Sequence, residues 1–212
     1  MNITFDLIIF DLDGTLVDSL DGITASVALA LRQENIPADP ARIKALIGLP
    51  LVNILDGIAG PDTPPALMAR LVKAYLDDYH AHCVERSAVY PGIRELVQRL
   101  GPRRTAVATT KRTPGAALLL AGLGLAPHLG LIQGTDGFPA KPDPAVLFRV
   151  LDHFRLPPER ALFVGDTPID IEAGRRAGIR TCGVTWGNSA REALTAAGAT
   201  WIADRTADIP GV

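Results

Sequence analysis

Residues 5–16 read Phe-Asp-Leu-Ile-Ile-Phe-Asp-Leu-Asp-Gly-Thr-Leu, and this stretch decides the fold. Its first six residues form a short, mostly apolar run, which is typical of a strand buried on both faces of a sheet. The run ends abruptly at two acids, Asp11 and Asp13, which are followed by Gly14. Because glycine lets the chain turn at once, both carboxylates can face one small volume. The sequence therefore predicts an acidic site at the end of a buried strand.

Two later apolar runs end in the same way. Residues 105–108 lead into Thr109-Thr110-Lys111, and residues 161–164 lead into Gly165-Asp166-Thr167, with Asp170 close behind. Helix-like segments follow each run, so strands alternate with helices and an α/β fold with a doubly wound parallel sheet is predicted. In such sheets ligands bind beyond the carboxyl ends of the strands, where these polar clusters fall.

Two helix starts in this region carry clear signals. Thr113-Pro114 and Asp143-Pro144 each offer an N-cap residue followed by a proline. We expect Thr113 and Asp143 to be the N-caps and the prolines to take the first helical positions.

The segment from about residue 19 to residue 89 follows a different pattern. Apolar residues recur at helical spacing, with no strand-like run among them, in residues 21–32, 40–47, 51–58 and 65–83. This pattern predicts a helical domain inserted after the first strand. We assign residues 17–87 to that domain, and residues 1–16 with 88–212 to the α/β core.

Four carboxylates, those of Asp11, Asp13, Asp166 and Asp170, follow strand ends. Two unit charges about 4 Å apart repel by roughly 4 kcal/mol at an effective dielectric constant near 20. The four groups are therefore either well separated and solvated or held together by a cation. Oxygen ligands without His or Cys select a hard ion, and with a phosphoryl substrate they indicate Mg²⁺.

The stretch Asp11-Leu12-Asp13-Gly14-Thr15-Leu16 resembles the first motif of the haloacid dehalogenase (HAD) superfamily, whose members are mostly phosphatases. The other three motifs of that superfamily have counterparts in the expected order: Thr109 after a strand, Lys141 before a helix, and residues 165–170. The resemblance implies a Rossmann-like HAD core, and it makes the helical insert a cap domain. Features around residues 17–19, 48–50 and 173–178 are most similar to the phosphoglycolate phosphatase branch.

The resemblance also implies a role for each acid. Asp11 would be the nucleophile that forms an aspartyl-phosphate, and Asp13 would protonate the leaving oxygen and later deprotonate water. Mg²⁺ would be held by Asp11, by the backbone carbonyl of Asp13 and by Asp166. Asp170 would orient a metal-bound water.

The remaining candidates surround the phosphoryl group. Thr109 would offer its hydroxyl and Thr110 its backbone N–H to phosphoryl oxygens, while Lys141 would balance the charge of Asp11. Lys111 and Arg112 face either the phosphate or water, and the sequence leaves both alternatives open. Trp186 is interpreted as a core or rim aromatic.

The predicted function is hydrolysis of a small phosphorylated metabolite, with phosphoglycolate as the leading substrate. A beta-phosphoglucomutase-like phosphosugar mutase, a pyrophosphatase and a nucleotide phosphatase remain alternatives on the same chemistry. Asp13 argues against a dehalogenase, because a halide leaving group needs no proton. A non-catalytic module on the same fold is disfavoured, because all four motifs keep their functional residues.

Composition and charge limit the partners. The net charge of −2 over 212 residues gives no electrostatic footprint for nucleic acid or for a membrane surface. Two cysteines and the absence of a signal-peptide pattern predict a reducing, cytoplasmic location. We expect a monomer or a homodimer.

Overall fold

The computed structural model describes residues 4–212, which form two compact units. One unit consists of the chain up to Asp18 together with Val89–Val212, and the other consists of Ser19–Ala88. The smaller unit's function as a cap domain stays a prediction. A two-stranded sheet of β2 (Val17–Asp18) and β3 (Ala88–Val89) lies where the chain passes from one unit to the other.

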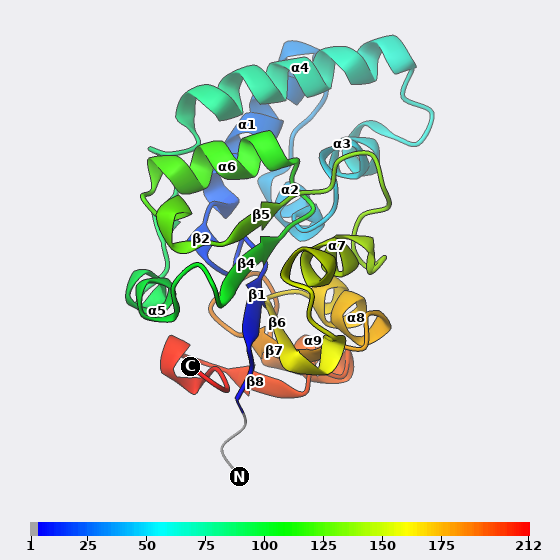
Figure 1. The fold of residues 1–212 in the computed structure, drawn as a ribbon. Coiled ribbons are helices and arrows are strands. Elements are labelled where there is room, and N and C mark those ends of the chain that lie inside the picture. Colours follow the sequence, from blue (N-terminus) through cyan, green and yellow to red (C-terminus); the bar gives the residue numbers. More distant parts are fainter. Residues whose placement is uncertain (1–3) are drawn as a thin grey trace. The chain divides into compact units, whose positions relative to one another are not determined.

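The larger unit is built on a six-stranded parallel sheet with the spatial order β5-β4-β1-β6-β7-β8 (Figure 1). The bounds of these strands, in chain order, are β1 Leu7–Phe10, β4 Thr105–Ala108, β5 Leu131–Gln133, β6 Ala161–Gly165, β7 Arg180–Val184 and β8 Trp201–Ala203. The predicted α/β fold with a parallel sheet is confirmed.

The first strand lies at the point where the strand order reverses. β1 is fully buried and pairs with β4 on one side and β6 on the other, so that Phe10 lies beside both Val107 and Val164. The carboxyl ends of these three strands therefore meet at one edge of the sheet. A reversal of strand order at such an edge is where open α/β sheets bind ligands.

Helices cover the sheet of the larger unit. They are α5 Ile93–Leu100, α6 Thr113–Gly122, α7 Ala145–Phe154, α8 Pro168–Arg176 and α9 Arg191–Ala196, with 3₁₀ turns at Ala126–His128, Pro158–Arg160 and Thr206–Asp208. Leu7 and Ile9 of β1 pack in one buried cluster with Val150 of α7 and Ala173 of α8. Alternate residues of a strand point to opposite faces, so this cluster covers one face of the sheet.

The smaller unit consists mostly of helices. Its helices are α1 Leu20–Gln33, α2 Pro40–Leu46, α3 Leu51–Ala59 and α4 Pro65–His82. Asp78 of α4 links the first and last parts of this unit, because its carboxylate accepts hydrogen bonds from the Ser26 hydroxyl and from Arg86, both at 2.7 Å. Burial is the largest influence on the pKa of Asp78 and by itself would raise it. The contacts with Ser26 and Arg86 together outweigh burial and hold this pKa below its usual range.

Both predicted N-caps are wrong by one residue. α6 begins at Thr113 itself and Arg112 is its N-cap, because the Thr113 hydroxyl bonds to Asp136 and accepts from the Gly134 N–H instead of capping the helix. Pro144 is the N-cap of α7. The Asp143 carboxylate accepts from the Ala145 N–H at 2.9 Å, which forms a local turn just ahead of the helix.

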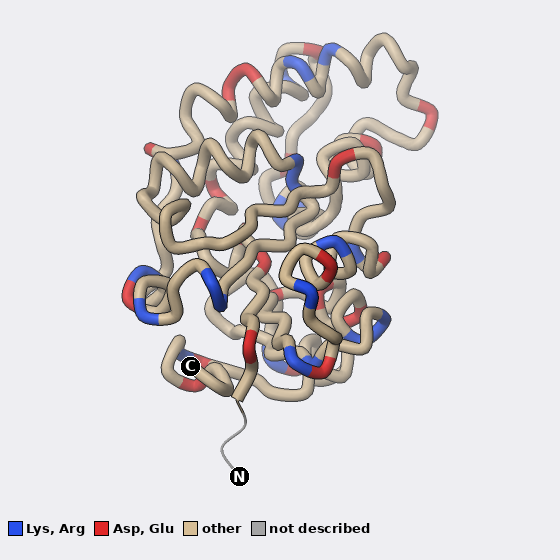
Figure 2. The backbone as a smooth tube through the Cα atoms, viewed as in Figure 1, with Lys and Arg blue, Asp and Glu red and all other residues tan. Residues whose placement is uncertain are grey.

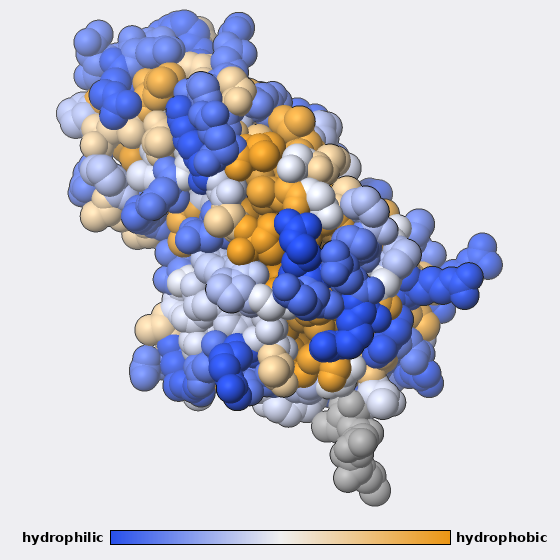
Figure 3. All heavy atoms as spheres, turned by 90° about the vertical axis from the view of Figure 1, so that its left-hand side faces the viewer, coloured by the Kyte–Doolittle hydropathy of each residue, from blue (hydrophilic) through white to orange (hydrophobic). Residues whose placement is uncertain are grey.

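The surface of the described chain is mixed in character. Basic and acidic residues are interleaved along the backbone (Figure 2). On the face drawn in Figure 3, hydrophobic residues reach the surface among hydrophilic ones, which is normal for folded proteins. Within residues 4–212, no helix combines the length and the apolar character needed to cross a bilayer.

Candidate active site

Asp11 is the first residue after β1. Its N–H donates to the Val164 carbonyl of β6 at 2.8 Å, so the backbone continues the sheet's hydrogen bonding for one residue past the strand. The chain then turns at Gly14, which has a φ of +88°. A Cβ on Gly14 would lie 2.2 Å from Oδ2 of Asp166. Glycine is therefore required here both by the turn and by the close approach of the Asp166 carboxylate.

Lys141 joins two of the predicted acids. Its Nζ lies 2.7 Å from Oδ1 of Asp11 and 2.6 Å from Oδ1 of Asp170, and it donates to the Ala108 carbonyl at 3.3 Å. The three donors of the ammonium group thus match three acceptors. Because the side chain is only 1% exposed, the ammonium is fixed in place rather than solvated.

Asp166 and Asp170 are held by hydrogen bonds from their surroundings. Oδ1 of Asp166 accepts from the Thr15 hydroxyl at 3.0 Å, and its Oδ2 accepts from the Asn188 N–H at 2.8 Å. Oδ2 of Asp170 accepts from the N–H and the hydroxyl of Thr167, which caps α8. The orientations of both carboxylates are therefore set by the protein before any ligand is bound.

Three buried carboxylates converge at this edge of the sheet. Asp11, Asp166 and Asp170 each offer an oxygen, and these oxygens all lie within 4.8 Å of one another. An all-oxygen set of this kind matches a hard divalent cation and does not suit a soft metal. The structure therefore brings together residues that could bind a divalent metal.

The electrostatics of the cluster favour an added cation. Burial raises the pKa of Asp11 to about 7, even though Lys141 lowers it, and the nearby Asp170 carboxylate contributes to the rise. Burial, together with Asp170 and Asp11, raises the pKa of Asp166 well above its usual value. Burial alone would lower the pKa of Lys141, but its two carboxylate partners raise it, so Lys141 stays charged. One ammonium does not balance three buried carboxylates.

A second cation lies beside Asp13. Nζ of Lys111 is 3.3 Å from Oδ2 of Asp13, and the two side chains are 12% and 11% exposed. Thr109, which is buried at the end of β4, accepts from the Lys111 N–H through its Oγ1 at 3.2 Å. Thr110 follows it and is half-buried. The sequence left the direction of Lys111 open, and in the structure it faces the first acidic motif.

The sequence did not identify the segment that supports Asp166 from the far side. Trp186, Gly187 and Asn188 follow β7, and the Trp186 ring N–H donates to the Thr15 carbonyl at 3.1 Å. A Cβ on Gly187 would lie 2.3 Å from the Gly14 carbonyl oxygen and 2.4 Å from Cβ of Asp166. The signal that could have revealed this segment is its place after another strand of the parallel sheet.

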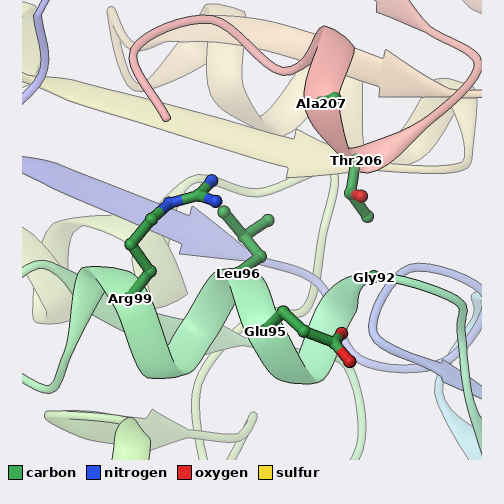
Figure 4. Close-up of a pocket in the computed structure, with 6 residues that line it drawn as sticks. All are labelled: Gly92, Glu95, Leu96, Arg99, Thr206 and Ala207. Carbon is green, nitrogen blue, oxygen red and sulfur yellow. The ribbon is translucent and has the colours of Figure 1, made fainter.

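The cavity of about 300 Å³ shown in Figure 4 lies elsewhere, between α5 and the Thr206–Asp208 turn. Leu96 and Arg99 project from α5 toward Thr206, and Glu95 is also part of its lining. None of the predicted site residues lines this cavity, so it is separate from the carboxylate cluster.

The comparison with known proteins decides the family. The model of the family described as "Haloacid dehalogenase-like hydrolase" matches residues 8–184, which is well over half of the chain. The chain belongs to this family. The resemblance found in the motifs of this haloacid dehalogenase-like hydrolase is therefore confirmed, and so is its assignment as an enzyme.

Individual relatives support the same family and branch. The phosphoglycolate phosphatase of Pectobacterium atrosepticum is 36% identical over 94% of this chain and 88% of its own length. That of Rhodospirillum rubrum is 34% identical over 95% of this chain and 88% of its own. Among solved structures, a haloacid dehalogenase-like family hydrolase from Streptococcus pneumoniae is similar with a TM-score of 0.83 and 27% identity, covering 95% of this chain and 94% of the other.

Proposed function

We propose that this hydrolase is a Mg²⁺-dependent phosphomonoester hydrolase that acts on a small phosphorylated metabolite, and that its substrate is phosphoglycolate. The observation that carries the proposal is the convergence of Asp11, Asp166 and Asp170 around Lys141 at the strand edge. The names of the relatives from Pectobacterium atrosepticum and Rhodospirillum rubrum support the substrate.

Asp11 is the proposed nucleophile. Its Oδ1 is held by Lys141 at 2.7 Å, and its other carboxylate oxygen attacks phosphorus. An oxygen–phosphorus bond forms to Asp11 while the ester bond to the leaving oxygen breaks, giving an aspartyl-phosphate. A water then attacks the same phosphorus, the bond to Asp11 breaks, and inorganic phosphate is released with the carboxylate restored.

Asp13 is the proposed proton carrier. It donates a proton to the leaving oxygen in the first step and takes one from the attacking water in the second, so its protonation state is restored each turnover. Gly14, with a φ of +88°, turns the chain directly after Asp13, so the proposed proton carrier stands one residue from the turn.

Protein groups also bind the phosphoryl oxygens. The Thr109 hydroxyl and the Thr110 N–H lie at the end of β4, next to β1 in the sheet, and we assign them to these oxygens. Lys141 steadies the charge that develops during transfer, because its ammonium is already fixed beside Asp11.

For the metal, we propose Asp11, Asp166 and the backbone carbonyl of Asp13 as ligands, with Asp170 supporting them. The chemistry that Mg²⁺ supplies when bound is neutralisation of charge on the phosphoryl oxygens. Thr15 and Asn188 hold the Asp166 carboxylate in one orientation for this purpose. A cytoplasmic location, a monomer or homodimer, and substrate selection by Ser19–Ala88 stay predictions.

A screen for phosphate release with Mg²⁺ tests the proposal across phosphoglycolate, sugar phosphates, nucleotides and pyrophosphate. We expect release from phosphoglycolate to have the highest kcat/KM. The variant Asp11→Asn should lose turnover while keeping the far-ultraviolet circular dichroism of the wild type, and Asp152→Asn, at an exposed aspartate on α7, is the matched control. Full turnover by Asp11→Asn contradicts the nucleophile assignment. Relocation of phosphate on beta-glucose 1-phosphate without release indicates a mutase instead.

A further inference from the structure

The four lysines of this chain fall into two classes of exposure. The side chains of Lys44 and Lys73 are 47% and 76% exposed, which is usual for lysine. Lys141 and Lys111 are 1% and 12% exposed. Withdrawing an ammonium from water is costly unless it gains a charged partner. The proposed mechanism gives Lys141 a role but gives none to Lys111.

Hydrogen bonds on both sides hold the backbone of Lys111 in place. Its N–H donates to Oγ1 of Thr109 at 3.2 Å, and its carbonyl accepts from the Thr135 N–H at 3.0 Å. The next residue, Arg112, turns away, since its side chain is 77% exposed and lies 3.5 Å from Asp136. Two adjacent cations therefore have opposite environments, and Lys111 is the one directed toward the acidic motif.

The contact of Lys111 with Asp13 indicates which part of the substrate Lys111 would face. Its Nζ lies 3.3 Å from Oδ2 of Asp13, the group proposed to protonate the leaving oxygen. A cation beside that acid lies near the alcohol part of the substrate, because the acid must reach the ester oxygen. Lys141, by contrast, contacts Asp11, the group proposed to attack phosphorus.

We propose that Lys111 is a specificity-determining residue that binds an anionic group on the alcohol part of the substrate. This inference rests on the proposed function and refines it: the preferred substrates are phosphomonoesters whose alcohol carries a carboxylate next to the ester carbon. Lys111 is suited to this role because an ammonium is a compact point charge on a flexible stem, which can move from the Asp13 carboxylate to a substrate carboxylate. The substrate's own anion then replaces part of the pairing that Asp13 provides in the free enzyme.

A matched pair of substrates separates this role from a general effect on Asp13. The pair is 2-phosphoglycolate and its amide. Both compounds carry the same phosphate ester, but the carboxylate of 2-phosphoglycolate is replaced by an uncharged carboxamide in the amide. In Lys111→Met we expect kcat/KM for 2-phosphoglycolate to fall roughly 10- to 100-fold, equal to about 1.4 to 2.8 kcal/mol, mainly through KM. For the amide the fall should be less than about 3-fold. Lys111→Arg should restore part of the preference, because it keeps the charge.

Arg112→Met is the control for bulk attraction of anions, because it removes a neighbouring cation that faces Asp136. Arg112→Met should leave the preference for 2-phosphoglycolate over the amide unchanged. Equal losses on both substrates in Lys111→Met overturn the proposal and assign Lys111 to the positioning of Asp13. An equal loss of preference in Arg112→Met overturns it as well.

A further test uses only the wild-type enzyme, so it does not depend on whether a variant folds. It should prefer 2-phosphoglycolate over the amide by at least about 10-fold, and this preference should weaken with added salt. A wild type that hydrolyses both equally disproves the role of Lys111 but leaves the phosphomonoester hydrolase intact. A wild type that hydrolyses no phosphomonoester, p-nitrophenyl phosphate included, disproves the proposed function itself.

Discussion

Replacing Lys141 with methionine removes the ammonium that contacts both Asp11 and Asp170. Methionine is similar in length and apolar, so the variant changes charge more than shape. The side chain of Lys141 is 1% exposed and those of its partners are 7% and 1% exposed, so water cannot take the place of the lost ammonium without rearrangement. Removing one partner of a buried ion pair typically costs about 3–5 kcal/mol.

That cost should depend strongly on pH. With Lys141 present, burial already raises the pKa of Asp11 to about 7, and without the ammonium it should rise further. A carboxyl whose folded-state pKa lies above its unfolded value stabilises the fold below the unfolded pKa, and this contribution is lost as pH rises through the folded pKa. The variant should therefore be closer to the wild type at pH 5.5 than at pH 8.

The loss of stability is measured by thermal unfolding in EDTA, monitored by fluorimetry at pH 5.5 and at pH 8. For a chain of this length, 3–5 kcal/mol corresponds to a fall in Tm of roughly 6–20 °C at pH 8. Lys73→Met is the control, because that lysine is 76% exposed and pairs with Asp77 on the surface of α4; its Tm should stay near that of the wild type. A variant Tm within 2 °C of the wild type at pH 8, or a deficit that is no smaller at pH 5.5, refutes the reasoning.

Two further predictions concern the same cluster. Gly187→Ala should lower Tm, because its Cβ would lie 2.3 Å from the Gly14 carbonyl oxygen and 2.4 Å from Cβ of Asp166, and such overpacking costs about 1–3 kcal/mol. Gly57→Ala is the control, because its added Cβ meets the flexible end of a leucine side chain. Equal Tm values for the two variants would show that the Cβ at position 187 causes no overpacking. Mg²⁺ should raise the wild-type Tm more at pH 8 than at pH 5.5, since the cation competes with the proton on Asp11, whose pKa lies at about 7. A larger rise at pH 5.5 would show that Mg²⁺ binds elsewhere.

Much of the fold was predictable because its signals are local. The apolar run before Asp11 and the later runs before Thr109 and Asp166 identified three strands, and the alternation of strands with helices indicated a parallel sheet. Helical periodicity predicted the elements of the smaller unit to within a residue or two. The caps at Thr113 and Asp143 could not be assigned correctly, because a side-chain hydroxyl or carboxylate can also bond outside its own helix.

The sequence by itself determined which residues stand at the carboxyl ends of the strands, because strand ends are set by the apolar pattern along the chain. Only the tertiary structure decided what surrounds those residues. Thr15 and Asp166 are 151 residues apart, and Trp186 reaches back 171 residues to Thr15. Likewise the burial that raises the pKa of Asp11, and the approach of Lys111 to Asp13, depend on packing between distant segments. Periodicity reports the environment of a segment but not its partners, because contacts between distant segments are fixed by the packing of the whole chain.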